Sequence, residues 1–556
     1  MQIKKIISIS LTVLLVLFTI PMSSIQAINS PENIFENYKY TISGNFATIT
    51  GLVTSPEGEV TVPDNINGYI VTEIGAKAFQ SEYKITNLIL PSTLVSIKES
   101  AFEHCTKLTD VKIPKTLKSI GHLAFNNTKL SNIYISDLSA WCNIETSEFS
   151  YGGKTLFLNN EPITTLKIPS DVNRINNHVF NGYDCITSVY IPDNVKEIGE
   201  YAFAYSKNIS KINFEYGVET IKKCAFMDCV GLTEIVVPDS VISLGEAAFY
   251  ECSYLKKATL SDNIEIIERD TFYDCRRMKE INLPKSVKSI GFKAFESCYV
   301  IGNLDFPNEL NYIAEYAFSN CRSLNKVDLP DNLTKIETGT FYNCYKLQEV
   351  IFHEGLKIIG NSAFANSNLL KVDLPQGLTT LDGNVFYNCK SLTTAYIPDS
   401  VTTIKPSFDK QVIIFGNMFS CAQKYASDYS LTFVATGIYK PSVKLVGSTK
   451  VVLEENGSLE YSSDCINWQT SGLVEGLKKN EDNIIYYRAN GNNLVSYITV
   501  IPDGMDEISN PNASHLVWAR KTLFTFENAN NLAADFNRDY EIDMLDIIHL
   551  KNLLLT

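Results

Sequence analysis

The chain lacks the features that most enzymes and nucleic-acid-binding proteins share. Its 556 residues hold 48 Lys and Arg against 62 Asp and Glu, a formal net charge of −14. Excess acidic side chains repel the phosphate backbone, so no nucleic acid is expected as a partner. The six histidines are scattered, and no HExxH, GxSxG, P-loop or dinucleotide-binding motif occurs. We therefore predict a protein that is not an enzyme.

Glycine, proline and tryptophan are also scarce. With 28 Gly and 19 Pro, the chain is neither collagenous nor of low complexity. Only three tryptophans, Trp141, Trp468 and Trp518, are present to offer broad aromatic platforms for sugars. Paired carboxylates for glycoside hydrolysis would be brought together only by folding, so a polysaccharide-degrading enzyme remains an alternative.

Long apolar runs are missing after the N-terminus. Lys4 and Lys5 precede an uncharged apolar run, Ile6 to Ile20, and Ala27 is the small residue that a signal peptidase needs. We predict a signal peptide over 1–27 and a secreted, extracellular protein. The alternative, a retained membrane anchor, needs about 20 apolar residues. No later apolar run reaches that length, so no membrane span is expected after signal removal.

A repeat fills most of the chain. A phenylalanine recurs every 23 residues almost throughout, with one interval of 55 and two of 22. The fourteen positions are Phe79, Phe102, Phe125, Phe180, Phe203, Phe226, Phe249, Phe272, Phe295, Phe318, Phe341, Phe364, Phe386 and Phe408. Ile or Leu stands five residues before nearly every one, and Pro stands eleven before most of them. A period of this length is typical of solenoids.

The spacing within one unit predicts its local structure. Val327 to Leu329 alternates as a short strand does, and Pro330 ends the strand by removing a backbone donor. Ile336, Phe341 and Cys344 would then turn back toward the interior. One coil cannot bury that face alone, so neighbouring coils would stack parallel strands over a shared core.

This unit, L-x-x-V-x-[IL]-P-x-x-[VL]-x-x-I-x-x-x-A-F-x-x-C, resembles the BspA-type leucine-rich repeat of bacterial surface and secreted proteins. The likeness covers about residues 37–434 and implies a repeat solenoid over 28–435. Tyr38 to Gly51 resembles the N-terminal hairpin of such arrays, and the stretch around Trp141 resembles an insertion that they carry. Ile413 to Ala435, with a short helix from Cys421, resembles their closing cap.

Eight of the 13 cysteines stand three residues after a repeat phenylalanine. They are Cys105, Cys229, Cys252, Cys275, Cys298, Cys321, Cys344 and Cys389. We interpret them as a ladder of buried thiols, because free cysteine behaves as a small apolar side chain. Disulfides between coils and metal binding are the alternatives, although no CxxC pair is present.

Solenoids usually bind through the outward residues of successive strands. We call the surface made by these positions the strand face. Its central residues are predicted to be Lys112, Lys167, Tyr190, Asn213, Val236, Thr259, Asn282, Asp305, Asp328, Ile351, Asp373 and Tyr396. The mixed chemistry, with a modest acidic stretch at the three aspartates, suits a protein or glycan ligand. A solvated face without a dedicated ligand is the alternative.

Residues 436–502 leave the 23-residue register. Short apolar stretches at 443–446, 451–453, 459–461, 484–487 and 497–501 alternate with turn signals and predict a small antiparallel sandwich. The residues around Trp468 resemble the fibronectin-III- or immunoglobulin-like modules of bacterial surface proteins. The module is expected to be a spacer, with Trp468 in its core.

The C-terminal segment, 503–556, carries the sharpest chemical pattern. Oxygen-bearing side chains occupy loop positions 1, 3, 5, 9 and 12, and position 7 can offer its carbonyl, which suits Ca²⁺. The residues are Asp535, Asn537, Asp539, Glu541, Asp543 and Asp546. An apolar stretch, Leu545 to Leu555, follows as a predicted helix.

This tail resembles the second calcium repeat of a cellulosomal dockerin, although Tyr540 replaces the preferred glycine and the first loop is degenerate. The resemblance implies a bound Ca²⁺ and a cohesin domain of a scaffoldin as the partner, with Met544 and Leu545 as contacts. We therefore expect a non-catalytic binding subunit of a cell-surface cellulosome. A polysaccharide-degrading subunit of glycoside hydrolase type and a host- or cell-adhesion protein are the alternatives.

Overall fold

The computed structural model describes residues 33–146 and 153–438, together with 441, 443–446, 450–453, 459–464, 468–478, 483–489 and 495–500. The predicted signal peptide, 1–27, and the predicted dockerin with its calcium and cohesin residues lie outside these described residues. The chain divides into two compact units, with the division after Ile301. Among the described residues, no helix is both long and apolar enough to cross a membrane.

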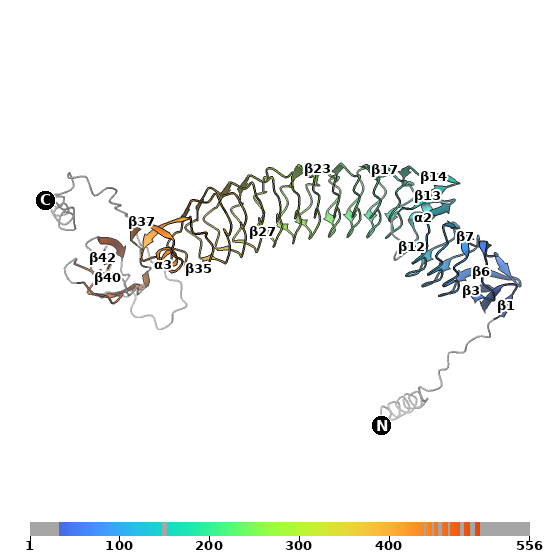
Figure 1. Ribbon diagram of the computed structural model, residues 1–556, viewed down its shortest axis with the longest axis horizontal. Coiled ribbons are helices and arrows are strands. Elements are labelled where there is room, and N and C mark those ends of the chain that lie inside the picture. The colour runs from blue at the N-terminus through green and yellow to red at the C-terminus, as the bar shows by residue number, and fades with distance from the viewer. Residues whose placement is uncertain are drawn as a thin grey trace, which may run out of the picture. The chain divides into compact units, whose positions relative to one another are not determined.

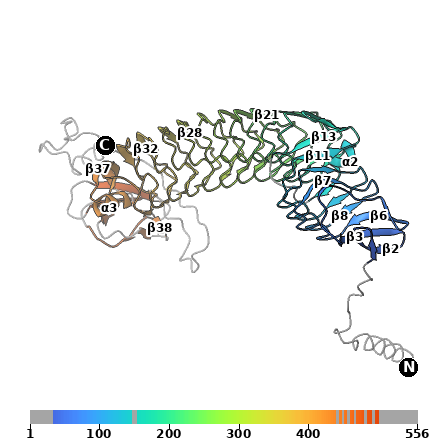
Figure 2. The ribbon, with the colours of Figure 1, turned by 45° about the vertical axis from the view of Figure 1, so that its right-hand side comes forward.

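The first unit opens with an antiparallel hairpin, as predicted for Tyr38 to Gly51. Strand β2 (Tyr38–Ser43) pairs with β3 (Phe46–Leu52), and Gly44 at φ +60° makes the turn. Strand β1 (Asn33–Phe35) joins the outer side of β2. Figure 2 shows β2 and β3 beside β6, where the hairpin meets the first parallel strands. The hairpin thus covers what would otherwise be an open sheet edge.

The remainder of the first unit is a parallel β-solenoid in which each coil contributes a strand to each of two sides. The strand face is formed by β4 (Gly58–Thr61), β7 (Ile85–Ile89), β9 (Asp110–Lys112), β11 (Asn132–Ile135), β13 (Thr155–Leu158), the antiparallel addition β14 (Glu161–Pro162), β15 (Thr165–Lys167), β17 (Ser188–Ile191), β19 (Lys211–Phe214), β21 (Glu234–Val236), β23 (Lys257–Thr259) and β25 (Glu280–Asn282). The other side is formed by β5 (Asn65–Ile66), β6 (Tyr69–Ile74), β8 (Ser96–Ile97), β10 (Ser119–Ile120), β12 (Glu145–Thr146), β16 (Arg174–Ile175), β18 (Glu197–Ile198), β20 (Thr220–Ile221), β22 (Ser243–Leu244), β24 (Ile266–Ile267) and β26 (Ser289–Ile290).

The insertion in the first unit contains a short helix, α2 (Leu138–Cys142), capped by the Asp137 carboxylate, which accepts a hydrogen bond from the Ala140 N–H. Trp141 is buried and its indole N–H donates to the Val179 carbonyl at 3.0 Å. The insertion therefore packs into the solenoid and does not stand apart from it.

The repeat phenylalanines form a buried spine in each unit. From Phe180 to Phe295 in the first unit, successive ring centroids lie 5.2–5.5 Å apart and the rings are stacked. From Phe318 to Phe408 in the second unit, the separations are 5.1–5.8 Å. Successive coils stack side by side within each unit (Figure 1). The prediction of a stacked solenoid core is confirmed.

From Phe79 to Phe386, each coil passes twice through the left-handed backbone region, two residues before and two after its phenylalanine. Around Phe249 these residues are Ala247 at φ 53° and Glu251 at φ 57°. The Phe249 N–H donates to the Thr271 carbonyl of the next coil at 2.9 Å, so a backbone ladder holds the turn. Left-handed residues cost roughly 1–2 kcal/mol each, which stacking must offset.

The second unit begins with the same kind of coil. Its strand face holds β28 (Lys326–Asp328), β30 (Glu349–Ile351), β32 (Lys371–Asp373), β34 (Thr394–Tyr396), β36 (Ile413–Met418) and β37 (Thr432–Ile438). Its other side holds β27 (Tyr312–Ile313), β29 (Lys335–Ile336), β31 (Ile358–Ile359), β33 (Thr380–Leu381) and β35 (Thr403–Ile404). Helix α3 (Cys421–Asp428), capped by Ser420, lies between β36 and β37, as predicted for the closing cap.

The coil after Phe364 is one residue shorter than its predecessor, and the loss falls in its turn. On the side opposite the strand face, the strands keep their parallel register across this turn, with Ile359 opposite Leu381. Ser367 stands in this turn, and its Oγ lies 3.1 Å from the Cys389 Sγ. The shortened turn therefore keeps the pairing on one side of the solenoid, whereas on the strand face β30 and β32 belong to separate sheets.

The segment after the cap forms two antiparallel sheets over one core. One sheet holds β38 (Val443–Val446), β39 (Lys450–Leu453) and β41 (Leu473–Glu475), and the other holds β40 (Leu459–Ser462), β42 (Asn483–Ala489) and β43 (Val495–Val500). Strand β41 was not predicted. The core includes Tyr461 and Tyr487. Trp468 is only half-buried and lies 4.1 Å beneath the Arg488 guanidinium, so its prediction as a core residue needs correction.

Candidate functional site

The strand face has the predicted register in the first unit. Lys167, Tyr190 and Asn213 stand opposite one another on β15, β17 and β19. A second set, Val236, Thr259 and Asn282, stands in line on β21, β23 and β25. All six side chains are exposed or half-buried, while the residue before each of them faces the interior. The row therefore presents a different side chain at every coil.

A second outward row carries alternating charge beside the first. Lys211, Glu234, Lys257 and Glu280 occupy the position two residues before the central one. The Lys257 ammonium lies 3.9 Å from the Glu234 carboxylate. Exposed pairs of this kind contribute about 0–1 kcal/mol, so they set the surface charge more than the stability.

The acidic stretch predicted for the second unit is partly neutralised. The Lys371 ammonium contacts the Asp373 carboxylate at 2.8 Å, and this hydrogen bond and charge raise the pKa of Lys371. The Lys326 ammonium lies 3.2 Å from Glu349 on the next strand. Asp305 is exposed as predicted, but it lies in a segment without a strand. The face is therefore mixed in charge and not strongly acidic.

The cysteine ladder faces the opposite way, into the core. The Cys252 thiol donates to the Phe226 carbonyl at 3.2 Å, and Cys275, Cys298 and Cys344 make the equivalent contact one coil back. All eight predicted thiols are fully buried, and the cysteines that the structure describes form no disulfides. Burial raises the pKa of Cys105 to about 12 and that of Cys389 to about 11. The interpretation as a ladder of buried thiols is confirmed.

A polar ladder runs along the turns of the second unit. The Asn343 side-chain amide donates to the Asn320 carbonyl oxygen at 3.0 Å, Asn366 donates to Asn343 at 2.7 Å, and Asn388 donates to Asn366 at 2.6 Å. Each side chain stands two residues after a spine phenylalanine, where asparagine tolerates the left-handed backbone. Because the amides satisfy one another, this ladder is explained by stability.

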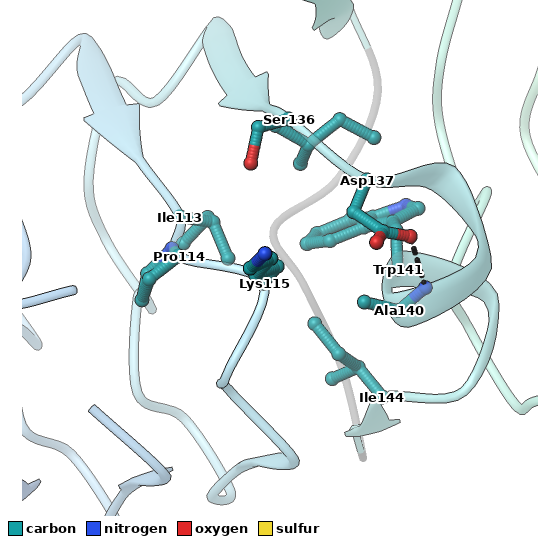
Figure 3. Close-up of a pocket in the computed structure, with 9 residues that line it drawn as sticks. Ile113, Pro114, Lys115, Ser136, Asp137, Ala140, Trp141 and Ile144 are labelled. Atoms are coloured by element: carbon teal, nitrogen blue, oxygen red, sulfur yellow. Dashed lines mark hydrogen bonds between the residues drawn. The ribbon is translucent and has the colours of Figure 1, made fainter. Parts of the chain in front are cut away.

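The described residues of the insertion around Trp141 enclose only a small hollow. The hollow beside the indole measures only about 10 Å³ and is lined mainly by apolar groups such as Ile113, Ile135 and Ile144. The one carboxylate in its lining, Asp137, is the cap of α2 (Figure 3). A hollow of this size holds at most a single water molecule. The alternative of an active site at this insertion therefore has no cavity to support it.

A buried lysine that the sequence did not reveal lies close to that insertion. Lys154 is completely buried, and its ammonium group lies 5.3 Å from the centre of the Tyr183 ring. Burial lowers the pKa of Lys154 to about 7, although the nearby Asp184 carboxylate partly opposes the shift. A lysine one position after two glycines gives no sequence signal of burial.

Metal binding is not supported in the described part of the chain, where no three His, Cys, Asp or Glu side chains gather closely enough to hold an ion. The predicted calcium residues, Asp535 to Asp546, lie beyond it.

The strand face extends further than the repeat register indicated. Tyr396 stands opposite Phe415 on β36, and Phe415 stands opposite Val434 on β37. Counting in steps of 23 ended the predicted row at Tyr396, because the next interval is 19 residues. Val412 to Phe415 is a continuous apolar stretch, so no alternation in the sequence marked Phe415 as an outward residue.

The comparisons with known proteins point to the repeat. The description "BspA type Leucine rich repeat region (6 copies)" matches residues 72–210, 173–302 and 289–411, which together span more than half of the chain. No curated protein matches.

Solved structures with similar folds include a leucine-rich repeat protein from Bacteroides ovatus ATCC 8483, at 22% identity, a TM-score of 0.48, and coverage of 73% of this chain and 99% of that one. A leucine rich cell surface protein from Faecalibacterium prausnitzii A2-165 is 23% identical, with a TM-score of 0.36 and coverage of 68% and 95%. The pneumococcal vaccine antigen PcpA is 17% identical, with a TM-score of 0.40 and coverage of 74% and 99%.

Proposed function

The chain belongs to the BspA-type leucine-rich repeat family, and from that membership we propose that it is an extracellular, non-catalytic binding protein whose strand face holds a protein or glycan ligand. The observation that carries the proposal is the contrast between the interior and the exposed row of each coil. The interior repeats the same residues from coil to coil, whereas the exposed row changes its chemistry at every step. Stability explains the repeated side, and recognition explains the varied one.

The test is an array of glycans, extracellular matrix proteins and bacterial surface proteins probed with the full chain. We expect the chain to be retained on at least one ligand class. Binding should be lost when Val236 and Ile351, two exposed row residues, are both changed to Glu. The matched control places Glu at Ile242 and Ile266, which are equally exposed but lie off the row. Reproducible sugar release from plant polysaccharides would contradict the proposal and favour the enzyme alternative.

The proposal includes attachment through the tail. Its support is the sequence pattern of oxygen-bearing side chains, which suits Ca²⁺, followed by an apolar helix-forming stretch. Without the ion, repulsion among the carboxylates would keep the loop open, so cohesin binding should depend on calcium through coupled folding. In the assembly proposed, the 436–502 segment is a fibronectin-III- or immunoglobulin-like spacer, for which the two antiparallel sheets over one core are the support.

The attachment is tested by cohesin capture with and without a calcium chelator. Replacing Asp535 and Asp543 together by Ala should abolish calcium-dependent capture. The control replaces Asp503 and Glu507 by Ala, the same change of charge outside the proposed ligand set. Replacing Met544 and Leu545 by Ala should weaken capture while calcium still binds. Capture that persists in chelator with the first variant would overturn the dockerin assignment.

A further inference from the structure

The strand face of the second unit ends in a row that carries two neighbouring aromatic residues. Asp373, Tyr396, Phe415 and Val434 stand opposite one another on β32, β34, β36 and β37. Two aromatic rings thus occupy neighbouring strands, which lie about 4.8 Å apart in a sheet. Figure 2 shows β32 and β37 with α3 at this end of the second unit.

The row borders an open hollow. It measures about 310 Å³ and is lined by Asp373, Thr394, Tyr396, Phe415 and Thr436. This volume lies at the lower end of the about 300–1,000 Å³ found for small-ligand sites. By comparison, the hollow beside Trp141 measures only about 10 Å³. The sheet end therefore offers room that the other hollow does not.

Hydrogen bonds hold the polar groups around the hollow in fixed positions. The Gln376 side-chain amide donates to the Tyr396 hydroxyl at 3.2 Å, which fixes the orientation of the ring. The Thr436 hydroxyl donates to the Asn417 Oδ1 at 3.0 Å, so its lone pairs remain available as acceptors. The Lys371 ammonium donates to the Asp373 carboxylate at 2.8 Å and orients it. Fixed groups lower the entropy cost of binding a ligand.

Flat aromatic surface edged by hydroxyl and carboxylate groups matches the chemistry of a sugar ring, whose C–H face is apolar and whose rim carries hydroxyls. Asp373 disfavours a polyanion. The row lies on the face of the sheet, and the backbone groups of β34 and β36 are paired with their neighbours, so a peptide could not add as a strand there. We propose that Asp373, Tyr396, Phe415 and Thr436 form a binding site for a neutral, linear glycan.

This inference rests on the proposed function and identifies where one ligand class would bind. The experiment titrates the full chain with cellohexaose, xylohexaose, mannohexaose and chitohexaose by isothermal calorimetry, because these β-1,4-linked chains present flat, uncharged faces. We expect at least one to bind. Tyr396→Ala should weaken that binding about tenfold or more, which corresponds to about 1.4 kcal/mol. Tyr396→Phe, which keeps the ring, should stay within about threefold.

Tyr190→Ala is the matched control, because Tyr190 occupies the same outward position on β17 in the first unit and is exposed. It should bind as the unchanged protein does. Asp373→Asn is the second test variant, and since both Asp373 and its partner Lys371 are well exposed, the fold should tolerate it. It should also weaken binding, so the inference stays testable if Tyr396→Ala fails to fold.

The outcomes separate the inference from the proposed function. If no hexasaccharide binds but the chain binds a protein on the array, the glycan site is wrong and the binding function stands. If neither class binds, both are wrong. If a hexasaccharide binds and the affinity is unchanged by Tyr396→Ala and Asp373→Asn, the site is elsewhere and the inference is overturned.

Discussion

The inward and outward sides of each solenoid coil contrast in what they repeat. On the inward side, Phe249 has a phenylalanine 5.5 Å away in the coil before and another 5.5 Å away in the coil after. On the outward side, Val236 is followed by Thr259 and then Asn282, with no common chemistry. The inward side must satisfy an identical neighbour, while the outward side meets only solvent or a ligand. Fold and recognition are therefore encoded by different residues of the same coils.

The strongest way to break this contrast is to remove a spine ring. Phe249→Ala should cost about 3–5 kcal/mol, because the side chain is fully buried between two others and the cavity cannot be filled by its stacked neighbours. Hydrogen exchange should show opening that starts at this coil, since stability in a solenoid depends on adjacent units. Phe249→Leu, which keeps most of the volume, should cost clearly less. Unchanged protection at this coil in Phe249→Ala would contradict the stacked spine.

Lys154 offers a test of the interior, because here the buried side chain is titratable. Its pKa of about 7 is below the ordinary value near 10.5, so the folded protein binds the proton less readily than the unfolded chain. Stability should therefore fall as the pH drops from about 10.5 to about 7 and remain level below, a loss of about 3 kcal/mol between about pH 9.5 and about pH 7. Lys154→Met should remove this slope.

Urea unfolding at the two pH values measures the effect of Lys154. Lys154→Met should gain stability relative to the unchanged protein at the lower pH and much less at the higher one. The control is Lys118→Met, a change of the same kind on an exposed side chain. Parallel pH profiles for the unchanged protein and Lys154→Met would show that the buried lysine keeps its proton.

The cysteine ladder should show a smaller effect. Cys252→Ala removes a buried sulfur and the weak hydrogen bond to the Phe226 carbonyl, and should cost about 1–2 kcal/mol. Cys421 is the matched control, because it is only half-buried, and Cys421→Ala should stay within about 0.5 kcal/mol. Thermal unfolding of the two variants measures the difference. Equal melting temperatures would argue against a packing role for the ladder.

The outward side should give the smallest change in stability. Val236→Ala removes an exposed side chain from the row and should alter the free energy of unfolding by no more than about 0.5 kcal/mol. Circular dichroism melting is sufficient to measure it. A loss comparable with that of Phe249→Ala would mean that the strand face is structural and is not a surface left free for recognition.

The sequence was sufficient to predict the interior of the solenoid because each interior position of the repeat occurs in many coils. The spine, the thiol ladder, the N-terminal hairpin and the helix of the closing cap all follow from spacing and alternation. Lys154, Phe415 and β41 did not, because each lies where the 23-residue register is interrupted or has ended. Their placement depends on contacts made only once, such as the packing of Lys154 against Tyr183. Likewise, Trp468 was expected in a core, but the Arg488 guanidinium covers its ring at the surface instead.

The shortened coil after Phe364 shows how the sequence of such a chain can change during evolution. A turn can lose a residue while Ile359 and Leu381 stay paired. Insertions and deletions of single residues can therefore be tolerated in the turns. Duplication of one whole coil creates no new packing problem, since the added copy meets the same phenylalanine and the same strand on both sides. Gene recombination between coils can therefore lengthen or shorten the array and shuffle its outward residues, so that a new specificity arises without a new fold.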